Sequence, residues 1–288
     1  MQEVHLKAMA KINLGLDVLR RREDGYHEVE MIMQTVNLYD KVHIKRTTEP
    51  GIRLETNLYF LPTNETNLAY KAAKLLMDEF DIKDGVDISI KKFIPVSAGL
   101  AGGSTDGGAV LYGMNQLFHL KLTRKQLMER GILLGADVPY CLMRGTALAQ
   151  GIGEKLTRLP SLTQRLVVLL AKPGINVSTK FVYSNLKLDE VKHPDIDAQI
   201  QAIKENNTNK MIENMGNVLE SVTIPAYPVI DEIKRCMMEN GALGAMMSGS
   251  GPTVFGIFSN KKDAINAQEI IRERQMAKLV YVTNFFNV

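Results

Sequence analysis

A run of fourteen residues, PVSAGLAGGSTDGG (Pro95–Gly108), constrains this 288-residue chain more than any other feature. It holds five glycines, and a helical pattern of apolar residues follows it. Glycine adopts positive φ and lets a ligand come close to the backbone, and the first N–H groups of a helix have no intrahelical acceptor. The segment Gly99–Thr105 therefore predicts a loop that holds phosphate groups at the start of a helix.

The spacing within this run separates it from two better-known phosphate loops. No Gly-Lys-Ser/Thr follows it, as in a Walker A loop, and the G-x-G-x-x-G pattern of dinucleotide folds is missing. Ser104 and Thr105 offer hydroxyls that can ligate Mg²⁺ or bond a phosphate oxygen. A second interpretation stays open, because Gly107, Gly108 and Ala109 also suit a close contact between a helix and a sheet.

The composition is that of a globular protein, with 45% hydrophobic and 23% charged residues. The length suits one large domain or two of ordinary size. The two cysteines, Cys141 and Cys236, have no CxxC or zinc-like spacing, which favours reduced thiols in an intracellular protein. A net charge of +3 with dispersed basic residues gives no case for nucleic acid.

The chain is also expected to be cytoplasmic and to bind no membrane. No stretch of about 18 apolar residues is present. Lys7 and Lys11 interrupt the N-terminal segment, which differs from a signal peptide with its unbroken apolar run.

The first half of the chain reads as strands interrupted by three helices. The strand candidates are 12–18, 29–36, 41–46 and 86–91. The helix candidates are 67–80, 104–118 and 123–134. Asn67 and Thr123 are suited to cap the first and third of these helices, and Gly135 to end the third.

In the second half, glycine and proline punctuate shorter elements. We expect strands at 165–171, 253–258 and 278–286, and helices at 211–220, 228–239 and 261–274. Residues 185–210 are polar, without a clear period. The predicted class is α+β, with helices packed on antiparallel strands, and we expect two domains, 1–155 and 156–288.

Asp137 and Lys11 are candidates for acid–base chemistry. Asp137 follows a predicted helix end in GADVP, and Lys11 alternates with the apolar Ile12 and Leu14. Taken singly, each has an ordinary interpretation, a turn aspartate and a solvated lysine. Side by side, the ammonium would keep the carboxylate ionised, and the carboxylate could accept a proton from a substrate hydroxyl.

Tyr26 and His27 lie in DGYHE, directly after a charged turn. The tyrosine offers a flat face on which a base can stack, and the histidine offers directional hydrogen bonds. The alternative interpretation is an ordinary surface turn.

Three regions in this order resemble the motifs of GHMP kinases. They are KINL (11–14) with GYH (25–27), PVSAGLAGGSTD (95–106) and SGSGPT (248–253). The resemblance covers nearly the whole chain and implies a two-domain fold with ATP and substrate in the cleft between the domains. It implies Mg²⁺-dependent transfer of the γ-phosphoryl group to the 2-hydroxyl of a cytidine-diphosphate-linked methylerythritol, in the non-mevalonate route to isoprenoid precursors. A monomer or a homodimer fits the resemblance equally well.

The resemblance also implies roles for single residues. Asp137 matches the catalytic base and Lys11 its partner, Tyr26 and His27 match the cytosine contacts, and Asn13 matches a substrate contact. Lys92 and Asn67 match adenosine contacts. Of the two hydroxyls in the first helical turn, that of Ser104 is the one expected to ligate Mg²⁺. The residues that match the loop around the ATP phosphates are Pro95, Gly99, Leu100, Ala101, Gly102, Gly103, Ser104 and Thr105.

The chain departs from the common family pattern GLGGGSS with two alanines shortly after it. Ala101 replaces a glycine, which raises the question of whether this position needs positive φ. Gly107 and Gly108 replace the alanines and predict a weaker helix start, by about 0.5–1 kcal/mol each.

Two alternatives of function remain at this stage. One is a GHMP kinase for mevalonate, homoserine or galactose, against which Tyr26 and His27 argue because those substrates carry no base. The other is a nucleotide-binding regulator without catalysis, against which the presence of both Asp137 and Lys11 argues.

Overall fold

The computed structural model describes residues 2–288, and they form two compact units. The first unit comprises the chain up to Ala10 with Leu38–Val96 and Ala101–Met143. The second comprises Lys11–Asn37, Ser97–Leu100 and Arg144–Val288. Each unit draws on separate stretches of the chain, and the domain boundary after residue 155 stays a prediction.

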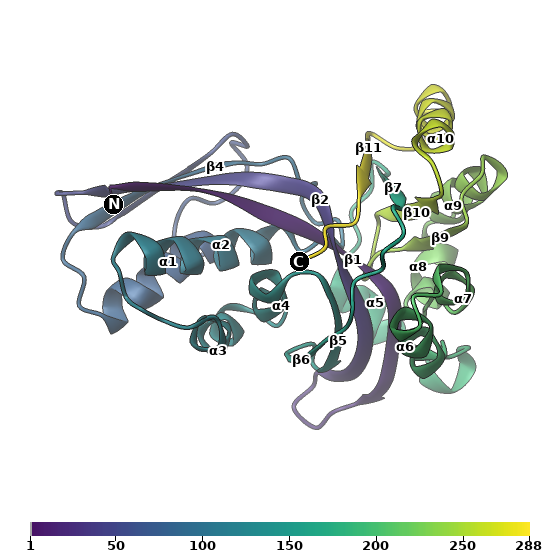
Figure 1. Cartoon of the computed structure of the whole chain (residues 1–288), viewed down its shortest axis with the longest axis horizontal. Coiled ribbons are helices and arrows are strands. Elements are labelled where there is room, and N and C mark those ends of the chain that lie inside the picture. The colour runs from purple at the N-terminus through teal and green to yellow at the C-terminus, as the bar shows by residue number, and fades with distance from the viewer. Residues whose placement is uncertain (1) are drawn as a thin grey trace. The chain divides into compact units, whose positions relative to one another are not determined.

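The first unit is a sheet with helices along one face (Figure 1). Its strands are the first part of β1 (Glu3–Arg21), the last part of β2 (His27–Thr47), β3 (Ile52–Thr56) and β4 (Gly85–Lys91). β4 runs antiparallel to β2 and parallel to β3. Its helices are α1 (Leu68–Glu79), α2 (Gly102–Leu117), α3 (Arg124–Leu134) and α4 (Val138–Met143).

Alternation along the strands decides which side chains meet the helices. Val4, Leu6 and Ile44 lie within 3.3 Å of the position that a Cβ on Gly113 of α2 would occupy. Since successive strand residues point to opposite faces, the residues between them point away from α2. The resulting core is built from buried aliphatic side chains of the sheet and of α1, α2 and α3.

The predicted helix signals of this unit are confirmed. Asn67 caps α1 by accepting from the Ala69 N–H, and Thr123 forms a capping box with Gln126 at the start of α3. The Gly135 N–H bonds the Gly131 carbonyl where α3 ends. Side-chain oxygens that accept from the first turn are how short helices begin at a defined residue.

The second unit combines the remaining parts of β1 and β2 with a separate four-stranded antiparallel sheet. β2 pairs with β5 (Thr146–Gly151), which pairs with β6 (Lys155–Arg158), and β1 pairs with β8 (Gly216–Asn217). The four-stranded sheet has the order β11 (Leu279–Asn284), β7 (Val167–Lys172), β10 (Val254–Phe258) and β9 (Gly244–Met247). Helices α9 (Val229–Glu239) and α10 (Lys261–Glu273) pack on it.

The expectation of an irregular segment at 185–210 is wrong. It contains a short 3-10 turn (Leu188–Glu190), α6 (Ile196–Lys204) and the start of α7 (Thr208–Glu213), and α5 (Thr179–Asn185) precedes it. Ile196, Ile200 and Ile203 are buried at helical spacing. Polar neighbours hid this period, and one of them, Gln199, is itself buried and donates to the Leu14 and Met211 carbonyls.

Two further boundaries differ from the expectations. Residues 29–36 and 41–46 belong to one strand, β2, because the intervening Asp40 is buried in the sheet instead of forming a turn. The helix expected at 211–220 is interrupted, since α7 ends at Glu213, β8 follows, and α8 (Glu220–Ala226) begins after it. The remaining strands and helices confirm the α+β class. Among residues 2–288, we find no helix with the length and apolar character needed to cross a membrane.

Candidate active site

The first half of the glycine-rich loop, Ser97–Leu100, packs against the second glycine-rich segment. Gly99 has φ +72°, and a Cβ built on it would lie 2.1 Å from the Ser248 carbonyl oxygen. The Ser248 hydroxyl donates to the Gly99 carbonyl over 2.9 Å. The Leu100 carbonyl accepts from the Lys11 N–H at 3.2 Å. Glycine at residue 99 is therefore required by both its conformation and its neighbour.

The second glycine-rich segment, 248–251, has its own support. Gly249 and Gly251 have φ values of +58° and +90°. The Asn217 side chain donates to the carbonyls of Met247 and Gly249, at 2.9 and 2.8 Å. A Cβ on Gly249 would lie 3.6 Å from Asn13 Oδ1. The two glycine runs and β1 thus meet, and Asn217, which sequence reasoning missed, fixes one of the runs.

Lys11 is buried, so the interpretation of a solvated strand lysine is wrong. The whole residue is only 5% exposed, and its Nζ donates to Asn13 Oδ1 over 2.8 Å. Asn13 is fully buried and contacts Met31 Sδ through Nδ2 at 3.4 Å. Burying an ammonium is costly unless polar groups or an anion surround it, and such buried charges are found preferentially at functional sites.

The second half of the loop begins helix α2. Ala101 adopts the left-handed conformation, with φ 57° and ψ 30°, and no side chain caps the helix there among the described residues. The Thr105 N–H bonds the Ala101 carbonyl at 2.9 Å. The N–H groups of Gly102, Gly103 and Ser104 precede this first bond of the helix. Such groups, with the helix dipole, form an anion site.

A buried cluster of charged residues anchors this helix start to the sheet. Lys92 Nζ forms ion pairs with Asp40 and Asp106, and it donates to the Gly102 carbonyl over 3.3 Å. Asp40 also accepts from the backbone N–H groups of Phe93 and Ile94. Neither aspartate was predicted, because nothing in the sequence links residues 40, 92 and 106. The adenosine contact expected of Lys92 stays a prediction.

The charges in this cluster are unequal, since one lysine faces two carboxylates. Burial, followed by the proximity of Asp40, raises the pKa of Asp106 to about 8, although Lys92 opposes the rise. Burial lowers the pKa of Lys92, but the two carboxylates outweigh it and the net shift is upward. Near neutral pH Lys92 is therefore an ammonium, and Asp106 binds its proton more tightly than an exposed aspartate does.

Asp137 lies between α3 and α4, and α4 packs against α2. Its carbonyl accepts from the Cys141 N–H at 3.0 Å. A Cβ on Gly108 would lie 3.6 Å from the Val138 carbonyl, at ordinary contact distance, so the start of α4 lies beside the second turn of α2 without requiring glycine there. Lys11 and Asp137 belong to different units, and their pairing stays a prediction.

Gly107 also faces a helix, so the expected close contact of these glycines with a sheet is wrong. A Cβ on Gly107 would lie 3.3 Å from the backbone carbonyl of Leu68 in α1. The small residue at 107 therefore allows α1 to approach α2 closely. The phosphate contacts of Gly102, Gly103 and Ser104 stay a prediction.

Tyr26 and His27 lie where the turn enters β2. Tyr26 is 60% exposed, and the His27 ring lies 5.0 Å from the ring of Tyr183 in α5. Burial and, to a lesser degree, Arg21 lower the pKa of His27, so the ring is neutral at pH 7. A neutral imidazole has one donor and one acceptor, which suits the edge of a base. Tyr183 carried no signal in the sequence.

The remaining predicted residues have structural surroundings of their own. The Asn67 side chain donates to the Pro62 carbonyl while it caps α1. Pro95 is buried and Ser104 half-buried. Their contacts with nucleotide and metal stay predictions.

Comparisons with known proteins agree with this geometry. Residues 67–145 match the GHMP kinases N terminal domain, and residues 191–277 match GHMP kinases C terminal. The chain is 56% identical to 4-diphosphocytidyl-2-C-methyl-D-erythritol kinase of Lachnospira eligens over 99% of both chains, and 48% identical to the enzyme of that name from Clostridium perfringens over 98% of both.

Solved structures agree as well. A crystal structure of 4-(cytidine 5'-diphospho)-2C-methyl-D-erythritol kinase has a TM-score of 0.84 and 30% identity over 99% of this chain and all of that chain. A homoserine kinase from Cytophaga hutchinsonii has a TM-score of 0.76 at 20% identity, covering 99% of this chain and 96% of the other, which shows a shared fold.

Proposed function

The chain belongs to the GHMP kinase family, and on this premise we propose that it phosphorylates the 2-hydroxyl of 4-diphosphocytidyl-2-C-methyl-D-erythritol with ATP. The observation that carries the proposal is 56% identity to a kinase of that name over 99% of both chains. The reaction would serve the non-mevalonate route to isoprenoid precursors. The alternatives of another small-molecule kinase or a silent regulator are not favoured.

Phosphoryl transfer depends chiefly on positioning and on neutralising charge. We assign the ATP phosphates to the free amides of Gly102, Gly103 and Ser104, where α2 begins. The close contact between Gly99 and Ser248 supports this assignment, because it fixes the loop that leads into the helix.

Mg²⁺ suits this site by its chemistry. It prefers oxygen ligands and is commonly held by one or two protein groups together with substrate phosphates, whose charge it neutralises. The Ser104 hydroxyl, half-buried in the first turn of α2, is the protein oxygen that we assign to it.

Asp137 is the residue that we assign as the base for the substrate hydroxyl, with Lys11 as its partner. The buried position of Lys11 supports its role, since a buried ammonium favours a nearby anion more strongly than an exposed one does. Asn13 accepts a hydrogen bond from Lys11 Nζ, and we assign it as a substrate contact.

The cytosine of the substrate is assigned to Tyr26 and His27. The exposed ring of Tyr26 is free to stack on a base, and the neutral His27 can both donate and accept. Tyr183, which contacts His27, would hold that ring in its orientation. Mevalonate, homoserine and galactose carry no base for this pair to recognise.

The two domains, 1–155 and 156–288, and the cytoplasmic location belong to the same proposal. The two family-model matches lie on either side of residue 155. Both cysteines are free and buried, which is compatible with a reducing compartment.

The proposal is tested by measuring ADP release with a coupled enzyme assay. Purified protein with Mg-ATP is given 4-diphosphocytidyl-2-C-methyl-D-erythritol, mevalonate, homoserine or galactose in separate reactions. We expect turnover with the cytidine substrate alone. Turnover with another of these alcohols would refute the substrate assignment, and ATP binding without turnover on any of them would favour a regulator.

A further inference from the structure

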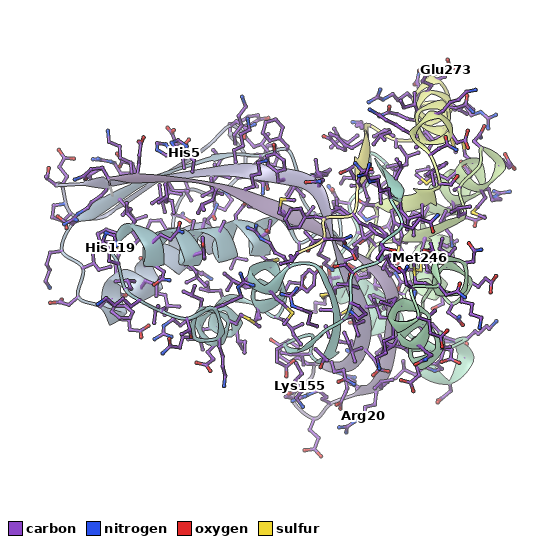
Figure 2. The ribbon with its side chains drawn as sticks, viewed as in Figure 1. His5, Arg20, His119, Lys155, Met246 and Glu273 are labelled. Atoms are coloured by element: carbon purple, nitrogen blue, oxygen red, sulfur yellow. The ribbon has the colours of Figure 1, made fainter. Side chains whose placement is uncertain are left out.

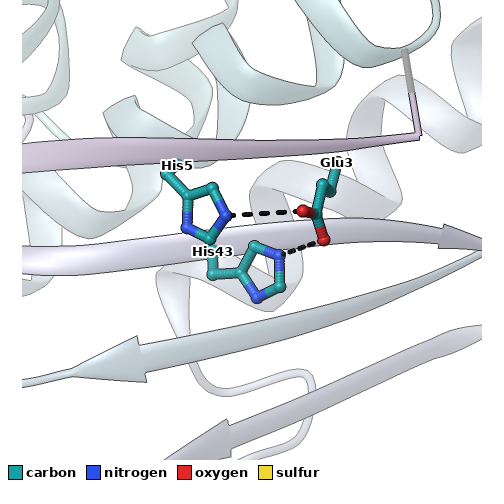
Figure 3. A group of neighbouring side chains, drawn as sticks. All are labelled: Glu3, His5 and His43. Atoms are coloured by element: carbon teal, nitrogen blue, oxygen red, sulfur yellow. Dashed lines mark hydrogen bonds and ion pairs between the residues drawn. The ribbon is translucent and has the colours of Figure 1, made fainter.

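Three potential metal ligands gather on the sheet of the first unit, away from α2. Glu3 and His5 lie two residues apart on β1, and His43 lies on the neighbouring strand β2 (Figure 3). The Arg46 N–H donates to the Gln2 carbonyl, which sets the antiparallel register of the two strands. Three residues forward on β1 and three residues back on β2, His5 lies opposite His43. Side chains two apart and directly opposite share one face.

Their donor atoms are close together. Glu3 Oε2 lies 3.0 Å from His43 Nε2, and Glu3 Oε1 lies 3.7 Å from His5 Nε2. One ligand atom from each of the three residues lies within 4.8 Å of the others. A tetrahedral ion with bonds of about 2.0–2.2 Å holds its donors about 3.4 Å apart, so small side-chain rotations bring these atoms to binding distance.

Among residues 2–288, the exposure of these side chains leaves room for such rotations. The side chains of His5 and Glu3 are 71% and 52% exposed, and that of His43 is 35% exposed. Val4 and Leu6, their strand neighbours, point to the opposite face, where α2 lies. The cluster is therefore open to solvent, and water molecules can complete the coordination of an ion.

The rings of His5 and His43 are parallel, with centroids 4.2 Å apart. A metal ion binds neutral imidazole rings, and neutral rings can stack in this way. The two oxygens of the Glu3 carboxylate each face a nitrogen of one ring, so the three residues bring their donor atoms together.

We propose that Glu3, His5 and His43 form a binding site for Zn²⁺ that is separate from the Mg-ATP chemistry. Two imidazole nitrogens and one carboxylate oxygen suit zinc and related transition metals, whereas Mg²⁺ and Ca²⁺ prefer oxygen ligands alone. Because the ligands come from two strands, the ion clips the beginning of β1 to β2.

Calorimetric titration of the untagged, chelator-treated full chain with ZnCl₂ tests the site. We expect one Zn²⁺ per chain, with an affinity that a large excess of Mg²⁺ leaves unchanged. His43→Asn and His5→Asn should each weaken binding by about tenfold or more. The matched control is His119→Asn, an exposed histidine beyond the end of α2 (Figure 2), which should leave the affinity within about twofold.

Thermal unfolding gives a second readout that does not depend on the heat of zinc binding. Zinc that binds only the folded state raises the melting temperature. The increase should occur in the wild-type chain and in His119→Asn, and disappear in His43→Asn. Zinc binding that survives in both His5→Asn and His43→Asn, or no binding by the wild-type chain, would overturn the proposal. Far-UV circular dichroism checks that each variant is folded.

Discussion

The two halves of the glycine-rich loop are held by different physical means, and the change occurs between Leu100 and Ala101. Before it, Gly99 is held by backbone contact with Ser248, so close that no side chain fits between them. After it, the start of α2 is held by buried charge, through Lys92 and its two aspartates. One half depends on the absence of a side chain, and the other on three specific side chains.

This difference explains which half tolerates departures from the family pattern. In the first half, a methyl group at residue 99 would collide with a backbone carbonyl that cannot move aside. In the second half, Ala101 occupies a left-handed conformation that favours glycine, at a cost of about 1–2 kcal/mol. The ion pairs and the packing of α2 hold the segment firmly enough to keep that strain.

The largest expected loss of stability is in the second half of the loop, which the buried charges of Lys92, Asp40 and Asp106 hold. Lys92→Met leaves the buried Asp40 and Asp106 without their cation, and we expect the free energy of unfolding to fall by about 3–5 kcal/mol. Lys91→Met, a change at the exposed neighbour, should cost less than about 1 kcal/mol. Urea unfolding of both variants measures the difference, and equal losses would show that the cluster does not anchor the helix.

The next effect is on the half held by backbone contact. Gly99→Ala combines positive φ with a Cβ 2.1 Å from the Ser248 carbonyl oxygen, and should cost about 2–4 kcal/mol of stability together with most of the ATP affinity. The matched change is Gly103→Ala, where the nearest atom, in Leu68, lies 3.9 Å away. It should be neutral or stabilising by up to about 1 kcal/mol. If both variants retain wild-type stability, the close contact is not a constraint.

Asp106, in the charged half, is expected to make stability depend on pH. The pKa of Asp106 is raised to about 8 in the folded chain, against about 4 when unfolded. Between these values the folded state binds a proton that the unfolded state lacks, so this contribution to stability is lost as pH rises from 4 to 8. Asp106→Asn removes the titration, and its stability relative to wild type should increase over that range. If the difference in unfolding free energy between Asp106→Asn and wild type is the same at pH 5 and pH 8.5, Asp106 does not carry the proton.

The smallest expected change in stability is at Ala101, where the second half of the loop begins. Ala101→Gly relieves the left-handed strain but adds entropy to the unfolded chain, so the two terms nearly cancel. We expect a change of less than about 1 kcal/mol. A loss of more than that in thermal or urea unfolding would mean that the Ala101 methyl group contributes packing that its surroundings do not suggest.

Local signals made much of the fold predictable. Asn67, Thr123 and Gly135 act within one helical turn of their own positions, so the sequence around them was sufficient. The glycine run was also recognisable as a helix start, although α2 begins at Gly102, two residues before the predicted residue 104.

Contacts between distant residues were not predictable. Asp40 fell between the two predicted strands 29–36 and 41–46, yet it lies within β2, where Lys92 and the amides of Phe93 and Ile94 bind its carboxylate. Asn217 fixes the second glycine run from 30 residues away in the sequence. The period of Ile196, Ile200 and Ile203 was available, but buried polar residues such as Gln199 obscured it.

The central claim is that the chain is a kinase in which Asp137 activates the substrate hydroxyl. The most direct test compares Asp137→Asn with wild type in ADP release, and measures ATP affinity by calorimetry in the same samples. We predict turnover reduced far beyond tenfold with ATP affinity nearly unchanged, because the phosphate site is formed by backbone amides of α2. A variant whose kcat stays within about tenfold of wild type, equivalent to about 1.4 kcal/mol, would exclude Asp137 as the base.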